Sequence, residues 1–496
     1  MSLKMGWAEV DITPEKGTKI GLAGQFFERI TDEVESRITV TAFALESGNE
    51  KMVIASCDLV AIGNNLHKLV KEQVESKYPE LKDKVITNAI HTHTSYEYVR
   101  TSSDVASSLD VLKQMLPEGM EYKPLVSNEK MFDPAKAVYF LADKISEAVI
   151  SAWENRAEGY YANAFGRVAV GMNRRVCYDD GSAKMWGDTN LANFEELEAG
   201  NDTGVEIIYT YDENKQLNGV IANIACPAQV VEHRNFISSD YWGKVKENLR
   251  KHFGRNIFVL ALCSAAGDLC PRDLIRWVSP ETPIDDPNIH RENPIERRAD
   301  PSMFDISGLK VVGRRVSNEL ISVYEELDEN AIKNDGILKH ETLSMAFPLR
   351  RVTIAEYENA LEKIESYVAK NRGRAMTFSD NAKMQIYAGT ISRYKMQQTV
   401  NTFNTEIHVI RFGDIAIATS PFELFLNYGN KIRARSKAKQ TFLIELSCGV
   451  ENYLPTKKAE EGGHYSANIG GGLTGHEGGD ILVRETLTHI NDMFKD

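Results

Sequence analysis

Two histidines separated by one residue form the segment best suited to metal chemistry. His91 and His93 lie in the run Asn-Ala-Ile-His-Thr-His-Thr, at the end of a stretch, residues 84–90, that is typical of a β-strand. Alternate side chains of a strand point to the same side, so we expect both imidazoles to face one volume. Neutral imidazole is a common zinc ligand. The segment therefore predicts a metal site, and two hydrogen-bonded histidines near the surface are the alternative.

Four further segments place polar or reactive side chains after expected strands. They are Asn223 to Pro227 with Ile237 to Asp240 beyond it, Ala265 to Pro271, Ser420 to Leu424, and Glu451 to Thr456 with His464 and Tyr465 beyond it. Sheets of α/β proteins collect their ligands at the carboxyl ends of strands. These segments therefore strengthen the prediction of a site around His91.

The order of these segments resembles that of the neutral/alkaline ceramidases. Ala8 to Pro14 is similar to the GxADIT opening of that family, and the resemblance continues to the closing helix through Arg37, 42–45, 56–59, the His-Thr-His run and Asn173-Arg174. It implies a single ceramidase-like catalytic domain over residues 1–496, without the C-terminal immunoglobulin-like domain of the full-length ceramidases. It also implies an α/β (α+β) fold, a layered β-sheet core flanked by helices.

The resemblance implies a set of ligands for Zn²⁺. The family holds the ion with the first His of its HTH segment, the Glu of a PGE segment and a Tyr, which match His91, Glu423 and Tyr453. Its remaining ligand, the His of an AxHP segment, corresponds by position to Cys226. A thiolate also binds zinc, whereas His233, seven residues later, offers the imidazole. Both alternatives stay open at this point.

The resemblance further implies hydrolysis by metal-activated water. His93 is then the expected general base and acid, and Tyr465 and Arg174 are expected to stabilise the oxyanion or to orient the carbonyl. Asp58, at the end of an expected strand, is a candidate to orient one of the histidines, and the alternative is that it caps a loop. The expected enzyme is a zinc-dependent hydrolase that cleaves a linear amide (N-acyl) bond.

The residues after the His-Thr-His run depart from the family pattern. The family has Ser-Gly-Pro, whereas this chain has Thr94-Ser95-Tyr96, and the bulky Tyr96 would fill space that glycine leaves open. We therefore expect a small or lipid-like substrate other than long-chain ceramide. Arginine pairs with carboxylate in two parallel bonds, and three arginines suit such a substrate: Arg100, Arg174 and Arg175. The alternatives are an esterase or deacylase acting on a carbohydrate or another small polar substrate, and a non-catalytic relative that keeps the fold.

Composition excludes several other classes of protein. The formal net charge of −13 and the lack of a basic cluster argue against nucleic-acid binding. No run approaches the eighteen or so apolar residues that a transmembrane helix needs. The six cysteines are scattered without a CxxC pair, which argues against a disulfide framework. A soluble globular protein is expected.

Hydrophobic periodicity predicts the elements that position these residues. Helical spacing is expected over 64–78, 134–153, 241–253, 305–327, 354–370, 379–396, 424–436 and 481–494. Strands are expected at 51–59, 84–90, 166–171, 205–211, 219–226, 256–263, 338–347, 407–418 and 441–447. No internal repeat is visible in the sequence. Two stretches, 271–303 and 455–480, are expected to be long loops that wall a site.

Overall fold

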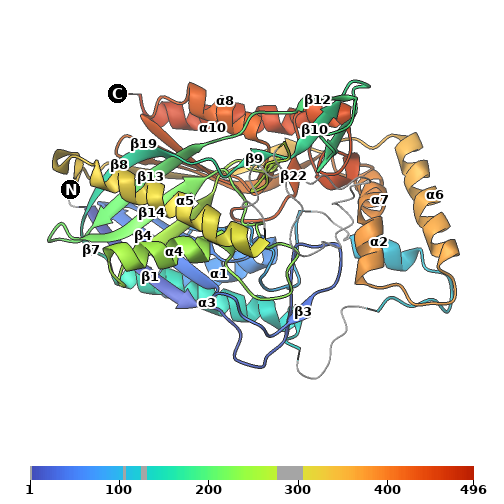
Figure 1. Ribbon diagram of the computed structural model, residues 1–496, viewed down its shortest axis with the longest axis horizontal. Helices are drawn as coiled ribbons and strands as arrows, with labels where there is room; N and C mark the ends of the chain where they lie inside the picture. The colour runs from blue at the N-terminus through green and yellow to red at the C-terminus, as the bar shows by residue number, and fades with distance from the viewer. Residues whose placement is uncertain (1–2, 104–107, 124–130, 276–304, 496) are drawn as a thin grey trace.

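The structure is a computed structural model that describes residues 3–103, 108–123, 131–275 and 305–495 (Figure 1). Most of the expected long loop at 271–303 lies outside these residues. Almost all the expected helices and strands form within a few residues of their predicted bounds. The exception is the strand expected at 166–171, because the ladder there is β8 (Tyr160–Arg167), six residues earlier. The α/β class is confirmed.

One arrangement of elements occurs three times along the chain. Three antiparallel strands are followed by a helix, a fourth strand parallel to the third, and a second helix. The first set is β1 (Leu3–Asp11), β4 (Thr39–Ser47), β5 (Glu50–Cys57), α1 (Asn64–Lys77), β6 (Val85–Ala89) and α3 (Pro134–Glu154). The second is β8, β13 (Gly204–Tyr211), β14 (Leu217–Ile224), α4 (Asp240–Phe253), β15 (Phe258–Cys263) and α5 (Asp305–Glu325). The third is β17 (Leu338–Pro348), β18 (Thr402–Phe412), β19 (Ile415–Thr419), α8 (Leu426–Arg435), β21 (Gln440–Ile444) and α10 (His476–Met493).

This repeat is not visible in the sequence, and the structure explains why. The insertions differ in every copy: residues 12–38 separate the first two strands of the first set, residues 168–203 those of the second, and residues 349–401 those of the third. The third insertion holds two helices of its own, α6 (Ile354–Lys370) and α7 (Phe378–Met396). Similar elements therefore do not recur at a fixed spacing in the sequence.

Each sheet buries one face under its own helices and the other against the two other sheets. The helix pairs are α1 with α3, α4 with α5, and α8 with α10 (Figure 1). The inner faces share one apolar cluster with side chains from all three sheets, among them Trp7, Phe43, Ile208, Leu260, Phe412 and Phe442. Alternation along the strands produces this division, because neighbouring side chains face opposite sides of a sheet.

Hydrogen bonds at the strand ends join the three sheets around the central cluster. The Asn223 side chain, at the end of β14, donates to the Leu443 carbonyl of β21 at 2.8 Å and accepts from the Leu443 amide at 3.2 Å. The Ala89 amide of β6 donates to the Leu446 carbonyl at 3.2 Å. The Glu445 amide donates to the Cys263 carbonyl of β15 at 3.1 Å, so the end of each fourth strand is fixed relative to a neighbouring sheet.

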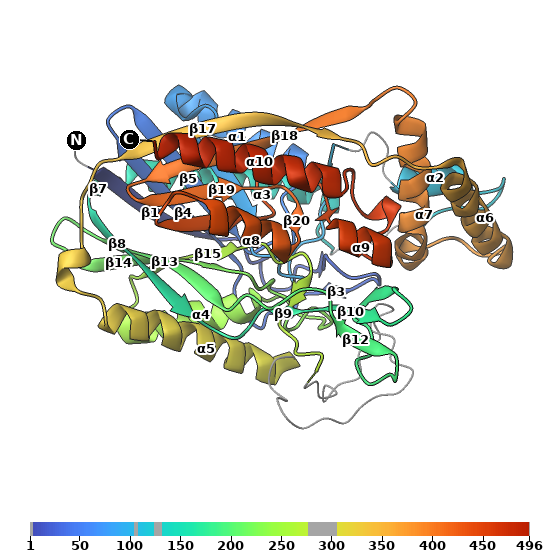
Figure 2. The ribbon, with the colours of Figure 1, turned by 90° about the horizontal axis from the view of Figure 1, so that it is seen from above.

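A smaller cluster of helices stands at the end of the molecule away from both termini. It consists of α6, α7 and the short α2 (Ser108–Gln114), which pack around Leu112, Ile364 and Ile391 (Figures 1 and 2). The helices among the described residues are too short or too polar to cross a membrane.

We predict that removing the Asn223 side chain destabilises the whole fold. Asn223→Ala leaves the buried Leu443 amide and carbonyl without their partner, and each such group costs about 1–3 kcal/mol. We expect the free energy of unfolding in urea to fall by about 2–4 kcal/mol. Asn214→Ala, in an exposed turn, is the matched control and is expected to stay within about 0.5 kcal/mol of the wild type. An equal effect of both variants would contradict this role of Asn223.

Candidate active site

The ends of parallel strand pairs from two of the sheets bring together the residues of the site. His91 and His93 follow β6. Glu423 lies in β20 (Glu423–Leu424), after β19, and Tyr453 lies in β22 (Tyr453–Leu454), after β21. The two short strands pair in parallel with Glu423 opposite Tyr453. The structure therefore brings together residues that are more than about 300 positions apart in the chain.

The surrounding backbone fixes the orientation of His91. The loop after β5 holds this segment, since the amides of Ile90 and Thr92 donate to the carbonyls of Cys57 and Leu59. The His91 Nδ1 lies 2.7 Å from the Val60 carbonyl, which can only accept, so Nδ1 carries the proton. Burial lowers the pKa of His91, which favours the neutral ring. Its Nε2 therefore presents a lone pair, 3.7 Å from Oε2 of Glu423.

The Nε2 atom of His93 lies beside the same volume. Arg174 Nη1 donates to the Gln229 side-chain oxygen at 3.3 Å, so the Gln229 amide nitrogen faces His93 and donates to its Nε2 at 2.9 Å. The proton of His93 is then on Nδ1, which faces the Glu232 carboxylate at 3.6 Å. Burial lowers the pKa of His93 well below its ordinary value, and His91 adds to the effect.

Two histidine nitrogens and a carboxylate thus converge on one volume. The Nε2 atoms of His91 and His93 are 3.2 Å apart, and Glu423 is beside His91. A cation in this volume would be stabilised by the Glu423 carboxylate and by the lone pair of His91 Nε2. An imidazole and a carboxylate with a phenol nearby form a donor set that zinc accepts.

Arg174 and two tyrosines form the polar wall beside the histidines. Arg174 Nη2 donates to the Gly267 carbonyl at 3.0 Å and lies 3.4 Å from the Tyr453 hydroxyl. The hydroxyls of Tyr453 and Tyr465 are 3.1 Å apart. Burial raises the pKa of Tyr453, and the nearby Glu423 adds to this. Tyr465 and Arg174 are therefore joined through Tyr453, as expected for groups that act on one carbonyl.

A cavity of about 370 Å³ opens onto this wall. Its lining includes Glu423, Tyr453 and Tyr465, and α7 contributes Gln385 and Ile386. A second cavity, of about 600 Å³, shares Tyr465 and Ile386 with the first and extends towards Trp186. The wall beside Glu423 is therefore reached through a space wide enough for a small molecule.

Solved structures with the same arrangement of elements are ceramidases. A crystal structure of neutral ceramidase from Pseudomonas aeruginosa superposes with a TM-score of 0.64 at 16% identity, over 99% of this chain and 75% of that one. A ceramidase complexed with C2 gives 0.65 at 14% identity, over 98% and 74%. This chain has the neutral ceramidase fold. No protein-family model and no curated protein matches the sequence.

The structure does not bring the expected fourth zinc ligand, Cys226 or His233, to the site. The Cys226 thiol is buried in the core and donates to the Val170 carbonyl at 3.4 Å. His233 faces Asp305, with Nε2 at 3.7 Å from the carboxylate. In the described part of the chain, neither residue forms a group of potential ligands with His91 and Glu423 within 4.8 Å. The ligand role expected of Cys226 or His233 is therefore not supported by the geometry.

Among the described residues, the one group of three His, Cys, Asp or Glu side chains that meets this distance limit lies away from this site. His67, Glu406 and Cys448 place ligand atoms within 4.8 Å of one another. Glu406 is already paired with Lys71 at 2.6 Å and with His67 at 2.9 Å. The Lys71 ammonium supplies the positive charge that a metal ion would bring, so we interpret this group as a buried ion-pair network.

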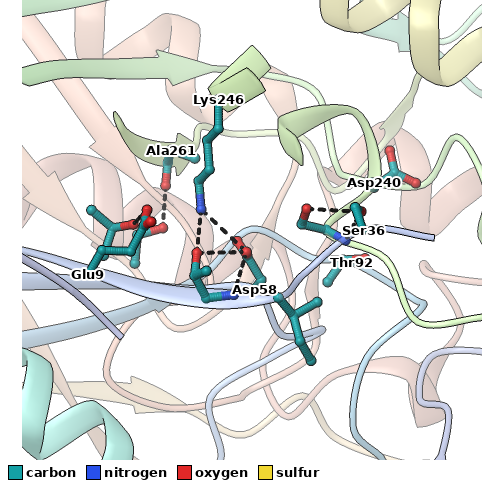
Figure 3. Close-up of polar contacts among 12 residues, drawn as sticks. Glu9, Ser36, Asp58, Thr92, Asp240, Lys246 and Ala261 are labelled. Atoms are coloured by element: carbon teal, nitrogen blue, oxygen red, sulfur yellow. Dashed lines mark hydrogen bonds and ion pairs between the residues drawn. The ribbon is translucent and has the colours of Figure 1, made fainter. Parts of the chain in front are cut away.

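Asp58 acts on the histidines through the backbone rather than by direct contact. Its carboxylate accepts from the Thr39 amide at 2.8 Å and lies 3.3 Å from Lys246 Nζ, and Figure 3 shows Lys246 reaching from α4 onto it. The expected bond to a histidine is absent among the described contacts of Asp58, because a backbone carbonyl, that of Val60, orients His91. Asp58 anchors the start of the loop that carries this carbonyl.

Tyr96 does not narrow the site as the sequence suggested. Its ring is buried against Phe132 and Phe140 in the core of the first sheet. The expected effect on the substrate pocket is therefore not seen, because the chain turns the Tyr96 ring away from the cavity.

Sequence reasoning missed four residues that hold His93. Gln229 and Glu232 contact its two ring nitrogens, and the Gln25 side chain lies 3.4 Å from Nδ1. Gly24, with a φ of +92°, closes over the ring, since a Cβ there would lie 2.5 Å from it. Gln25 and Gly24 lie in the insertion after β1, and no sequence spacing relates them to His93.

We predict strong coupling between Asp58 and Lys246. Asp58→Asn or Lys246→Met alone leaves a buried charge without its partner and is expected to cost about 3–5 kcal/mol of unfolding free energy. The double variant is expected to recover part of that loss, and urea unfolding of all four proteins measures the coupling. Lys251→Met, exposed on the same helix, is the control. Simple additivity of the two single losses would refute the coupling.

Proposed function

We propose that this protein is a zinc-dependent hydrolase that cleaves the amide bond of an N-acyl compound. The observation that carries the proposal is the lone pair of His91 Nε2, preset by Val60 and held 3.7 Å from the Glu423 carboxylate, with Nε2 of His93 3.2 Å away. The solved structures that share the fold are ceramidases, which supports amide hydrolysis as the class of reaction. The Glu423 carboxylate favours a bound cation, because a metal ion would offset its negative charge in the interior.

The residues that would hold the ion are His91, Glu423 and Tyr453. His91 is preset for this role, since Val60 keeps its proton on Nδ1 and leaves Nε2 free to bind. When bound, zinc would supply a water of lowered pKa and would polarise the scissile carbonyl.

The other polar groups have separate roles in the proposed reaction. His93 Nε2 exchanges its hydrogen bond from Gln229 for a proton from the attacking water and returns that proton to the leaving amine, while Glu232 stabilises the charged ring. Arg174 and Tyr465 donate to the oxygen that becomes negative, and their link through Tyr453 holds them in place. The cavity beside Tyr465 receives the rest of the substrate.

One departure from the family pattern favours an alternative function, that of a non-catalytic relative with the same fold. The Cys226 thiol is turned into the core, so the position that matches a family ligand contributes none. A metal-free protein with an intact fold is expected under this alternative, and metal content separates the two.

We predict that zinc binding depends on His91 and not on Cys226 or His233. Purified wild type is expected to hold roughly one zinc ion per chain, and His91→Ala to lose most of it. Cys226→Ser and His233→Gln are matched controls that should keep wild-type zinc, because their side chains face away from Glu423. Metal analysis after dialysis against a weak chelator gives the result. Wild-type zinc content in His91→Ala would show that this site is not the one that binds the ion.

We predict that short polar N-acyl compounds are better substrates than long-chain ceramide. Most of the residues lining the cavity beside Glu423 carry hydroxyl, amide or charged groups or are glycines, which disfavours a long apolar chain. We expect kcat/KM for long-chain ceramide to be at least roughly tenfold lower, a difference of about 1.4 kcal/mol in transition-state binding. Initial rates on a panel from N-acyl sphingosines to N-acetyl amino acids test this. Efficient turnover of ceramide alone would reverse the assignment of substrate.

A further inference from the structure

Arg100 is the arginine that lines the cavity beside Glu423. The other residues around this space are mostly neutral, with hydroxyls from Thr101 and Ser102 and amides from Gln385 and Asn452. In a chain of net charge −13, a guanidinium in such a cavity is a local centre of positive charge. An anionic group entering the cavity would be attracted to it.

The guanidinium of Arg100 has hydrogen-bonding capacity that the protein does not use. Its Nη1 is screened from solvent and has no hydrogen-bond partner in the described part of the chain. Its Nη2 lies 3.4 Å from both oxygens of Glu97, longer than the roughly 2.8 Å of a strong charge-assisted bond. The side chain stays about a quarter exposed, with 25% of its surface accessible. A buried donor without a partner is costly, so a ligand that completes this set gains affinity.

Neighbouring groups hold the Arg100 side chain in place. The guanidinium lies 5.3 Å from the centre of the Tyr98 ring. Tyr98 is itself fixed, because its hydroxyl donates to the Ala61 carbonyl at 2.8 Å and accepts from the Gly63 amide at 2.9 Å. A preformed position lowers the entropy cost of binding a charged group.

The other two arginines that the sequence suggested for a carboxylate, Arg174 and Arg175, already bind groups of the protein. Arg175 is fully buried, pairs with Glu198 at 2.8 Å and donates to backbone carbonyls at 459 and 463. The Nη atoms of Arg174 bind Gln229 and the Gly267 carbonyl. Of these three, Arg100 is therefore the arginine suited to a substrate group at some distance from the scissile bond.

We propose that Arg100 binds a carboxylate of the substrate and so makes this enzyme selective for N-acyl compounds that carry one. The inference rests on the proposed hydrolase function and gives it a substrate class. The carboxylate can belong to the amine portion, as in N-acyl amino acids, or to the acyl portion, as in amides of dicarboxylic acids. A planar guanidinium suits either, because it forms two parallel bonds with carboxylate.

The test compares charged substrates with neutral ones of the same shape. N-acetyl-leucine is paired with N-acetyl-leucinamide, and N-methylsuccinamate with its terminal carboxamide. Zinc-loaded wild type, Arg100→Gln and Arg100→Lys are assayed on all four, and thermal unfolding of each variant checks its folding. Glu97→Gln is the matched control, because it removes the partner of Arg100 and leaves the arginine in place.

We expect wild type to prefer one carboxylate compound over its carboxamide by at least about tenfold in KM. Arg100→Gln should lose that preference and keep its rate on the carboxamide, Arg100→Lys should keep part of it, and Glu97→Gln should retain or increase it. The preferred pair tells which portion carries the carboxylate. An unchanged preference in Arg100→Gln overturns the proposal and leaves the hydrolase function standing.

A direct binding measurement separates failure of the inference from failure of the function. Calorimetric titration of N-acetyl-leucine and N-methylsuccinamate into wild type and Arg100→Gln needs no turnover. Binding to wild type, lost in Arg100→Gln, supports the role of Arg100 even if no amide is hydrolysed. Equal binding of each carboxylate compound to the two proteins overturns it.

Discussion

Parallel strand pairs impose the geometry on which the site depends. Two parallel strands need a crossover connection, and both then end at the same edge of the sheet. In the described residues, each of the three large sheets contains one such pair, β5 with β6, β14 with β15 and β19 with β21, each crossed by one helix. Because the three sheets share one apolar core, they pack as one unit. This packing fixes the positions of their strand ends relative to one another.

The loops after these strands carry the expected metal ligands and the residues that hold His93, whereas Arg174 comes from the insertion between β8 and β13. The loop after β5 orients His91, the segment after β6 supplies both histidines, and the segments after β19 and β21 supply Glu423 and Tyr453. The loop between β14 and α4 supplies Gln229 and Glu232, which hold His93. Small shifts at any of these ends would separate the acceptors, so rigidity at the strand ends is a condition for the chemistry.

Much of this could be predicted from sequence, for identifiable reasons. The core helices are amphipathic and the buried strands are short apolar runs, so α1, α3, α4, β5 and β15 were found by periodicity. His91, Glu423 and Tyr453 were found because short motifs at strand ends kept their order. The three-fold arrangement was hidden by insertions of unequal length.

The expectations for Cys226, Asp58 and Tyr96 differ from the structure in side-chain direction, which sequence spacing alone does not determine. Cys226 matches a ligand position in the backbone, yet its thiol points to the Val170 carbonyl. Asp58 ends a strand beside the site, yet its charge is neutralised by Lys246 from a different element. Tyr96 follows the histidine segment, yet its ring packs with Phe132. In each case a contact distant in sequence decides where the side chain lies.

The position of the Cys226 thiol in the core also affects which residues can bind a metal ion. A buried thiol in apolar surroundings holds its proton, and burial raises the pKa of Cys226 well above its ordinary value. As a metal ligand it would have to lose that proton and leave the core, which costs both desolvation and packing. His91, by contrast, is already neutral, preset by Val60 and next to a carboxylate. The balance of these terms favours a site built on His91, Glu423 and Tyr453, and leaves Cys226 as part of the core of the second sheet.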